Sequence, residues 1–110
     1  MPAPASKSYN YLKRMGFKVE SPSTMTDAVM RDLFGLYNVL AVHPTRGLTL
    51  AVFAVSENVM GGATKKILES RWTPVLLTAR WNLEVHGWQS GILDPRIVRF
   101  MMRSGKPSIV

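Results

Sequence analysis

The sequence predicts a single α/β domain in which a mixed central sheet is flanked by helices. The chain has 110 residues, the usual size of one domain. Two nearly continuous apolar runs, LYNVLAV at 36–42 and LTLAVFAVS at 48–56, are typical of strands that are covered on both faces. Segments with apolar residues at helical spacing lie before and after these runs. Helices are therefore expected on the faces of the sheet.

Composition narrows the classes of partner and of chemistry. Fourteen Lys and Arg residues oppose seven Asp and Glu, a net charge of +7 that favours nucleic acid as a partner. The absence of cysteine excludes disulfides, thiolate zinc sites and cysteine nucleophiles. No apolar run of signal-peptide or membrane-spanning length occurs in the sequence. We therefore expect a cytoplasmic protein with no membrane partner.

The first elements follow from periodicity. Residues 1–5, rich in Pro and Ala, predict a flexible N-terminal tail. Apolar residues at helical spacing predict a helix over 6–15 that stops at Gly16. The alternating FKVE at 17–20 predicts a half-buried strand. The hydroxyl-rich segment 21–26, which includes a proline, predicts a loop.

The centre of the chain predicts a hairpin and its covering helix. The turn sequence HPTRG at 43–47 joins the two apolar strands. The amphipathic segment ATKKILESRW at 63–72 predicts a helix over the sheet. The segment at 74–81 is either a short helical turn or an edge segment.

The last third predicts one more strand and one more helix. NLEVHGW at 82–88 alternates cleanly and is expected near the sheet edge, with Glu84, His86 and Trp88 sharing one face. Asp94 followed by proline predicts a helix start before RIVRFMMR. The domain is then expected to span residues 6–103, with a flexible tail at 104–110.

Five segments, LKRMGFKVE, RDLFGLYNVLAVHP, LTLAVFAVSENV, KKILES and WNLEVHGW, resemble the PD-(D/E)XK nuclease superfamily, especially its short resolvase-like members in phage and bacterial genomes. The RDLFG block is the most specific of them. The resemblance implies a restriction-endonuclease-like αβββαβ core and a nucleic-acid partner, DNA rather than RNA. It also implies a homodimer, and Mg or Mn as cofactor in an active member.

Three positions depart from the pattern of that superfamily. Asn38 stands where its members have an aspartate, and Phe53 and Val55 stand where the third strand has its polar residues. A hard divalent cation needs charged oxygen ligands to activate water at a phosphate. The departures predict a pseudonuclease that binds nucleic acid, with no catalytic residue, metal site or cofactor assigned.

An active Mg- or Mn-dependent endonuclease, or a Holliday-junction-resolvase-like enzyme with an altered site, is the alternative. Its substitute ligands are Glu20, Asp32 and Glu57. Glu20 is better explained as a strand-end charge. Asp32 and Arg31 are better explained as residues that hold the loop through an ion pair or backbone hydrogen bonds. Glu57, with Asn58, reaches the site only if a bulge shifts the strand.

The basic residues predict the nucleic-acid contacts. Three of them recur along one side of the expected last helix and form the densest basic stripe. A further alternative is a small phage-type interaction module or inhibitor, which docks a host protein through the methionine-rich part of that helix. The predicted nucleic-acid-binding residues are Lys13, Arg14, Arg31, Lys65, Lys66, Arg96, Arg99 and Arg103.

The three tryptophans have two interpretations. Trp72, Trp81 and Trp88 are expected to anchor the core and the sheet edge. Stacking on unpaired bases is the alternative role. The two histidines, His43 in the turn and His86 on its strand, lack the spacing of a metal motif.

Overall fold

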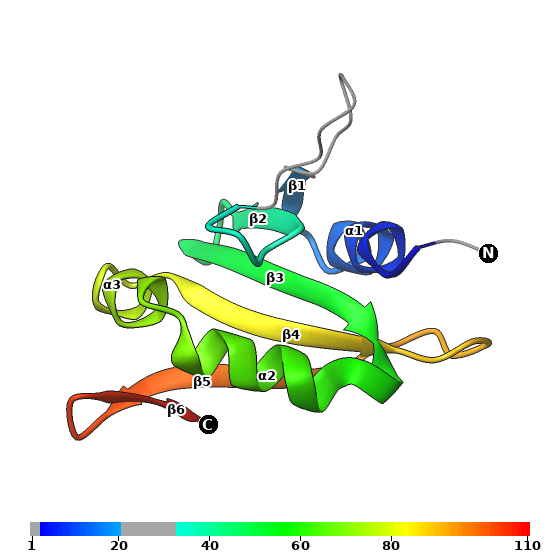
Figure 1. The fold of residues 1–110 in the computed structure, drawn as a ribbon. Coiled ribbons are helices and arrows are strands. Elements are labelled where there is room, and N and C mark those ends of the chain that lie inside the picture. The colour runs from blue at the N-terminus through cyan, green and yellow to red at the C-terminus, as the bar shows by residue number, and fades with distance from the viewer. Residues whose placement is uncertain (1–2, 21–32) are drawn as a thin grey trace.

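A computed structural model describes residues 3–20 and 33–110 of the chain (Figure 1). The described elements comprise three α-helices, one short 3-10 helix and six strands. In chain order they are α1 (Pro4–Arg14), β1 (Lys18–Glu20), β2 (Val39–His43), β3 (Leu48–Ser56), η1 (Glu57–Val59), α2 (Met60–Glu69), α3 (Trp72–Thr78), β4 (Asn82–Trp88), β5 (Arg96–Arg103) and β6 (Lys106–Ile109).

The strands form one mixed sheet in the order β1-β2-β3-β4-β5-β6. β3 and β4 run parallel and are connected through α2 and α3, whereas the other neighbouring pairs are antiparallel. The predicted α/β class, with a mixed sheet flanked by helices, is confirmed. The expected order αβββαβ is present, with α3 added before β4 and two strands added after it.

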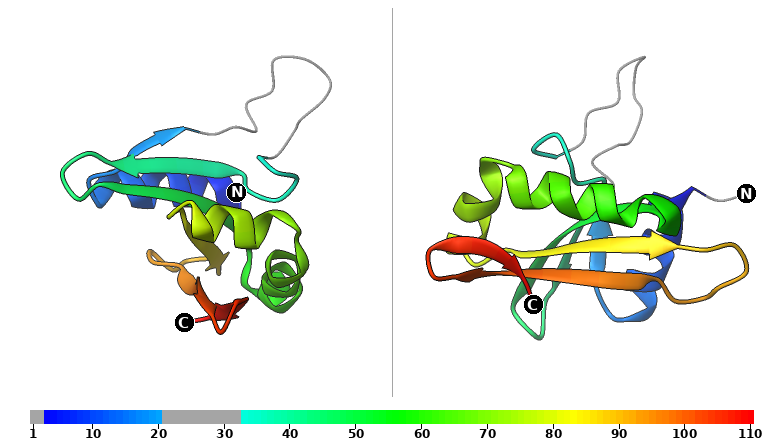
Figure 2. Two further views of the ribbon diagram at one scale, coloured as in Figure 1. Left: turned by 90° about the vertical axis from the view of Figure 1, so that its left-hand side faces the viewer. Right: turned by 60° about the horizontal axis from the view of Figure 1, so that its bottom comes forward.

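Helices cover both faces of the sheet (Figure 2). Strand alternation sends Leu50, Val52 and Ala54 of β3 toward α1, where they pack with Leu12. The intervening Ala51 packs on the opposite face with residues of α2 and α3. β3 is therefore buried on both sides, which explains its nearly continuous apolar sequence.

The larger apolar cluster lies on the α2 and α3 side. Ile67 of α2, Leu76 of α3 and Leu83 and Val85 of β4 meet there, each almost fully buried. Gly87 continues this face of β4, and a Cβ at that position would lie 2.0 Å from the sulfur of Met60. Glycine therefore allows α2 to approach the strand closely.

The predicted helix over 94–103 is wrong, because Arg96–Arg103 form β5. The flexible tail predicted at 104–110 is also wrong, because β6 pairs with β5 in antiparallel register. Ser104 and Gly105 both have positive φ, 52° and 78°, as a two-residue type I′ hairpin turn requires. RIVRFMMR carries apolar residues at both helical and alternate positions, and the hairpin selects the alternate reading.

Three further expectations are settled by the structure. The segment that could be a helical turn or an edge segment is the helix α3. β4 lies between β3 and β5, not near the sheet edge, because the hairpin of β5 and β6 extends the sheet beyond it. The first helix begins within the expected tail, at Pro4, where proline suits the first helical turn. The loop predicted at 21–26 lies outside the described residues.

Candidate functional site

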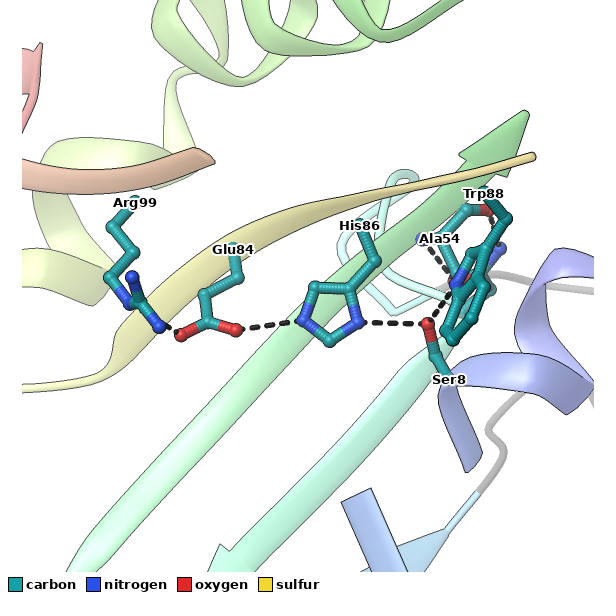
Figure 3. Close-up of polar contacts among 7 residues, drawn as sticks. Ser8, Ala54, Glu84, His86, Trp88 and Arg99 are labelled. Carbon is teal, nitrogen blue, oxygen red and sulfur yellow. Dashed lines mark hydrogen bonds and ion pairs between the residues drawn. The ribbon is translucent and has the colours of Figure 1, made fainter. Parts of the chain in front are cut away.

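A chain of hydrogen bonds joins α1 to the sheet (Figure 3). Ser8 Oγ lies 2.8 Å from His86 Nδ1, and His86 Nε2 lies 2.8 Å from Glu84 Oε1. The other carboxylate oxygen of Glu84 accepts a hydrogen bond of 3.1 Å from Arg99 Nε. Ser8 and His86 are completely buried. Polar side chains are found in a protein interior when each of them has a hydrogen-bond partner, as the members of this chain do.

The donors and acceptors in this chain are consistent with one arrangement of protons. Trp88 Nε1 can only donate, and it gives a hydrogen bond of 2.8 Å to Ser8 Oγ. Because the Glu84 carboxylate is an acceptor, His86 Nε2 must carry a proton. In a neutral imidazole Nδ1 then accepts from the Ser8 hydroxyl. Each buried polar atom of the chain is therefore satisfied.

The chain contains a serine, a histidine and a carboxylate, the residue types of a hydrolytic triad. The Ser8 hydroxyl, however, has no exposed surface and already accepts from Trp88. Tyr11 packs edge-on against both His86 and Trp88, with ring centroids 5.8 and 6.2 Å apart. A nucleophile must reach its substrate, so the chain attaches α1 to β4 and does not form a hydrolytic site.

Sequence reasoning did not single out Ser8. The alternation of Glu84, His86 and Trp88 on one face of a strand was visible, and three polar-tipped side chains facing a covered side of a sheet need partners. That signal predicts a buried polar network but does not say which helical residue completes it.

A cavity of about 400 Å³ lies between the C-terminal part of α1 and the sheet. Its size falls within the range of small-ligand pockets, about 300–1,000 Å³. Polar and apolar atoms contribute to its walls about equally, and Glu84 and Arg99, the outer end of the polar chain, form part of them. The other residues that line it are Tyr11, Leu12, Met15, Phe17, Arg46, Leu48, Leu50, Asn82, Leu83, Ile97, Phe100 and Val110.

The basic residues of α1 lie close to aromatic rings. Lys13 Nζ lies 5.2 Å from the Tyr9 ring centroid, and the Arg14 guanidinium lies 5.9 Å from that of Tyr11. Lys7 lies 5.9 Å from the ring of Trp88. Each basic residue of α1 therefore contacts an aromatic face, and the helix sequence contains no acid.

The position at which the superfamily has its aspartate is used for strand pairing. Asn38 Nδ2 donates to the carbonyl of Ala54 at 3.0 Å, and the Ala54 amide donates to Asn38 Oδ1 at 2.9 Å. The backbone N–H of Asn38 also donates to the carbonyl of Val52, so the residue continues the pairing of β2 with β3. An amide supplies both the donor and the acceptor, whereas a carboxylate supplies acceptors only. Asn38 is thus a member of a hydrogen-bond network.

The other positions of the expected metal site also differ from it. Phe53 and Val55 pack against the apolar cluster on the α2 side. Glu20 is exposed at the end of β1, and Glu57 forms an ion pair of 3.0 Å with Arg96. Within residues 3–20 and 33–110, no three His, Cys, Asp or Glu side chains are grouped to hold a metal. These described residues do not fit a magnesium or manganese site. Asp32 and Arg31 lie outside the described residues.

The predicted nucleic-acid-binding residues do not form one surface. Lys13 and Arg14 lie on α1, whereas Lys65 and Lys66 are exposed on α2, over the opposite face of the sheet. The predicted stripe of Arg96, Arg99 and Arg103 along a helix is wrong. In a strand, residues three apart point to opposite faces. Arg96 accordingly pairs with Glu57, and Arg99 pairs with Glu84.

Comparisons with known proteins provide no relative for this chain. No protein-family model, curated protein or solved structure matches it. Among the helices of the described segments, none has the length and hydropathy needed to cross a lipid bilayer.

Proposed function

We propose that this protein binds nucleic acid through the basic α1 surface, defined as Lys7, Lys13, Arg14 and Arg46. The observation that carries the proposal is that all three basic residues of α1 contact an aromatic ring, on a helix that has no acid. Lysine and arginine neutralise backbone phosphates and supply most of the affinity for nucleic acid. Arg46 adds a further cation at the wall of the adjoining cavity.

The charge balance supports the same proposal. Of the fourteen basic residues, Arg31 lies outside the described part of the chain, and the described residues hold thirteen. They hold five acids, of which Glu57 and Glu84 are already paired with arginines. The described surface therefore has a large positive excess, and DNA, an extended polyanion, is the partner that we expect.

The proposal describes binding without metal-dependent hydrolysis. Asn38 bonds the backbone of Ala54, and the partly buried Phe53 packs against the apolar cluster, so neither supplies a charged ligand to a cation. On this proposal, the resemblance of RDLFG and its neighbouring segments to nucleases reflects a shared fold that has kept a binding surface and lost the catalytic site.

The test compares two double variants with equal loss of charge. Lys7→Gln with Lys13→Gln removes two cations from the basic α1 surface, and Arg103→Gln with Lys106→Gln removes two from the hairpin of β5 and β6. Each lost phosphate contact should lower the slope of log K against log salt by about 0.9 for duplex DNA. We expect a shallower slope and weaker binding for the α1 pair alone. Equal losses in both pairs would contradict a site on α1.

The absence of cleavage needs a separate assay. Junction, flap and single-stranded DNA are incubated with the full chain and either Mg²⁺ or Mn²⁺, and we expect no products. Reproducible products that disappear in Asp32→Ala or Glu57→Gln would show that hydrolysis survives with substitute ligands. That result would replace the pseudonuclease proposal with an active enzyme and leave the binding proposal in place.

A further inference from the structure

Three aromatic side chains cluster on the face opposite α1. The ring centroid of Phe34 lies 5.0 Å from that of Trp72 and 5.8 Å from that of Trp81. The Arg71 guanidinium lies 5.6 Å from the Trp72 ring. Phe34 and Trp81 also pack on the buried cluster, which anchors the group to the core. We name Phe34, Trp72 and Arg71 the aromatic platform.

The backbone at Phe34 is not what a turn sequence would favour. Phe34 and Gly35 both have positive φ, 54° and 75°, and the Leu36 amide bonds the carbonyl of Leu33 at 3.1 Å. This is the φ pattern of a type I′ turn, whose first central position prefers Asn, Asp or Gly. A phenylalanine at this position has a strained backbone conformation, and the turn alone gives no reason for it. We therefore attribute its presence to the contacts of its ring. Strain of this kind is concentrated at functional sites.

The platform is partly open to solvent. Trp72 is 37% exposed, and Arg71 beside it is exposed as well. A large aromatic ring that packs on Phe34, lies beside Arg71 and is still partly exposed resembles neither a core residue nor an isolated surface residue.

The chain segment that carries Arg71 and Trp72 is basic. Residues 60–81 contain Lys65, Lys66, Arg71 and Arg80 against one acid, Glu69. All four basic side chains belong to exposed residues. The occupant of such a surface should therefore combine a flat apolar face with negative charge.

We propose that the aromatic platform stacks an unpaired nucleobase, with Arg71 contacting the phosphate of the same nucleotide. The inference rests on the proposed binding of nucleic acid and goes beyond it, because it identifies single-stranded or branched nucleic acid as the preferred class. Bases stack on exposed aromatic rings with little dependence on sequence, and an arginine beside the ring adds attraction to the strand. A base inside a duplex has no free face to offer, so a duplex would contact the cations alone.

The test measures affinity for single-stranded oligothymidine and for a DNA hairpin with the same number of phosphates, whose loop is replaced by a flexible linker without bases so that every base is paired. Trp72→Leu removes the ring and keeps an apolar side chain, while Trp72→Phe keeps a ring. Val75→Ala, on an exposed residue of the same helix, is the control. We expect Trp72→Leu to bind the single strand about 5- to 150-fold more weakly, the range for one lost stacking contact. Binding of the hairpin should change little, and Trp72→Phe should restore most of the affinity.

The outcomes separate the two proposals. If Trp72→Leu binds the single strand as tightly as the wild type does, while binding stays salt-dependent, the platform is contradicted and the basic α1 surface stands. Equal loss for the single strand and the hairpin would also contradict stacking. If the wild-type protein binds neither DNA at low salt, both proposals fail.

Discussion

The two faces of the sheet are held to their helices by different forces. On the α2 and α3 side, Ile67, Leu83 and Val85 form an apolar contact whose strength depends on buried area. On the α1 side, Ser8 and His86 add a polar chain to the apolar contact of Leu12. Apolar packing tolerates small changes in the orientation of a helix, whereas hydrogen bonds form only at defined distances and angles. The α1 side is therefore positioned precisely, as a binding surface requires.

The largest expected effect is on the apolar side. Ile67 has no exposed surface, so Ile67→Ala leaves a cavity in the cluster beneath α2. The free energy of unfolding should fall by about 3–4 kcal/mol. Urea denaturation measures this value. A loss below about 1 kcal/mol would mean that the cluster is loosely packed and that the comparison of the two faces is wrong.

The next effect tests the polar chain. His86→Leu leaves Ser8 and Glu84 without their shared partner, at a cost of about 2–3 kcal/mol. Ser8→Ala should cost less, because the bonds that it removes join neutral groups, whereas His86→Leu removes a hydrogen bond to the Glu84 carboxylate.

The double variant Ser8→Ala with His86→Leu is the control for coupling within the chain. Its loss should be smaller than the sum of the two single losses, because both changes remove the same hydrogen bond. Additive losses would show that the two side chains act independently.

A smaller effect appears only at alkaline pH. Burial raises the pKa of Tyr37 from 10.0 to about 12. The polar side chain of the nearby Thr73 has the smaller, opposite effect on this pKa. The Thr73 hydroxyl donates to the carbonyl of Ile67, and the Tyr37 hydroxyl has no hydrogen-bond partner in the described part of the chain. The unfolded chain releases this proton first, so the stability is intact below pH 10 and declines from pH 10 to 12.

Tyr37→Phe tests this assignment. Tyr37 should account for about 2 kcal/mol of the alkaline loss, and the variant should remove that part of it. Near pH 7 the variant should be as stable as the wild type or more stable, because an unpaired buried hydroxyl is removed. Thermal unfolding between pH 7 and 12 measures both effects, and an unchanged alkaline slope would contradict them.

The smallest effect compares two arginines of β5. Arg96 pairs with Glu57 at the surface, and its side chain is 74% exposed. Arg96→Gln should change the free energy of unfolding by less than about 1 kcal/mol. Arg99→Gln should cost more, because Arg99 bonds a carboxylate that is only 13% exposed and belongs to the polar chain. Equal effects would show that the chain does not extend to Arg99.

The sequence was most informative where one pattern excluded the others. The apolar runs of β2 and β3 and the alternation of β4 fit strands alone, and the amphipathic α2 fits a helix. RIVRFMMR fits both periods, and only the turn at Ser104 and Gly105 decides for a strand. The helix prediction is wrong because the pattern within RIVRFMMR alone does not distinguish a helix from a strand, and the turn that follows it does.

The candidate site was less predictable because its contacts join distant parts of the chain. Ser8 and His86 are separated by 78 positions, and nothing in the sequence of α1 distinguishes Ser8 from an ordinary polar helical residue. The three arginines predicted to share one side of a helix lie in a strand, and the strand directs Arg96 and Arg99 to opposite faces of the sheet. Asn38 stands alone as a polar residue in an apolar run, but its pairing with Ala54 depends on the register of β2 and β3, which the sequence does not show.

The most direct test of the central claim is the salt dependence of DNA binding by the full chain. Affinity for a fluorescently labelled duplex is measured from 50 to 200 mM salt and plotted as log K against log salt. A surface that contacts three or four phosphates should give a slope of about −3 to −4. No measurable binding at the lowest salt, or binding that does not change with salt, would contradict the account.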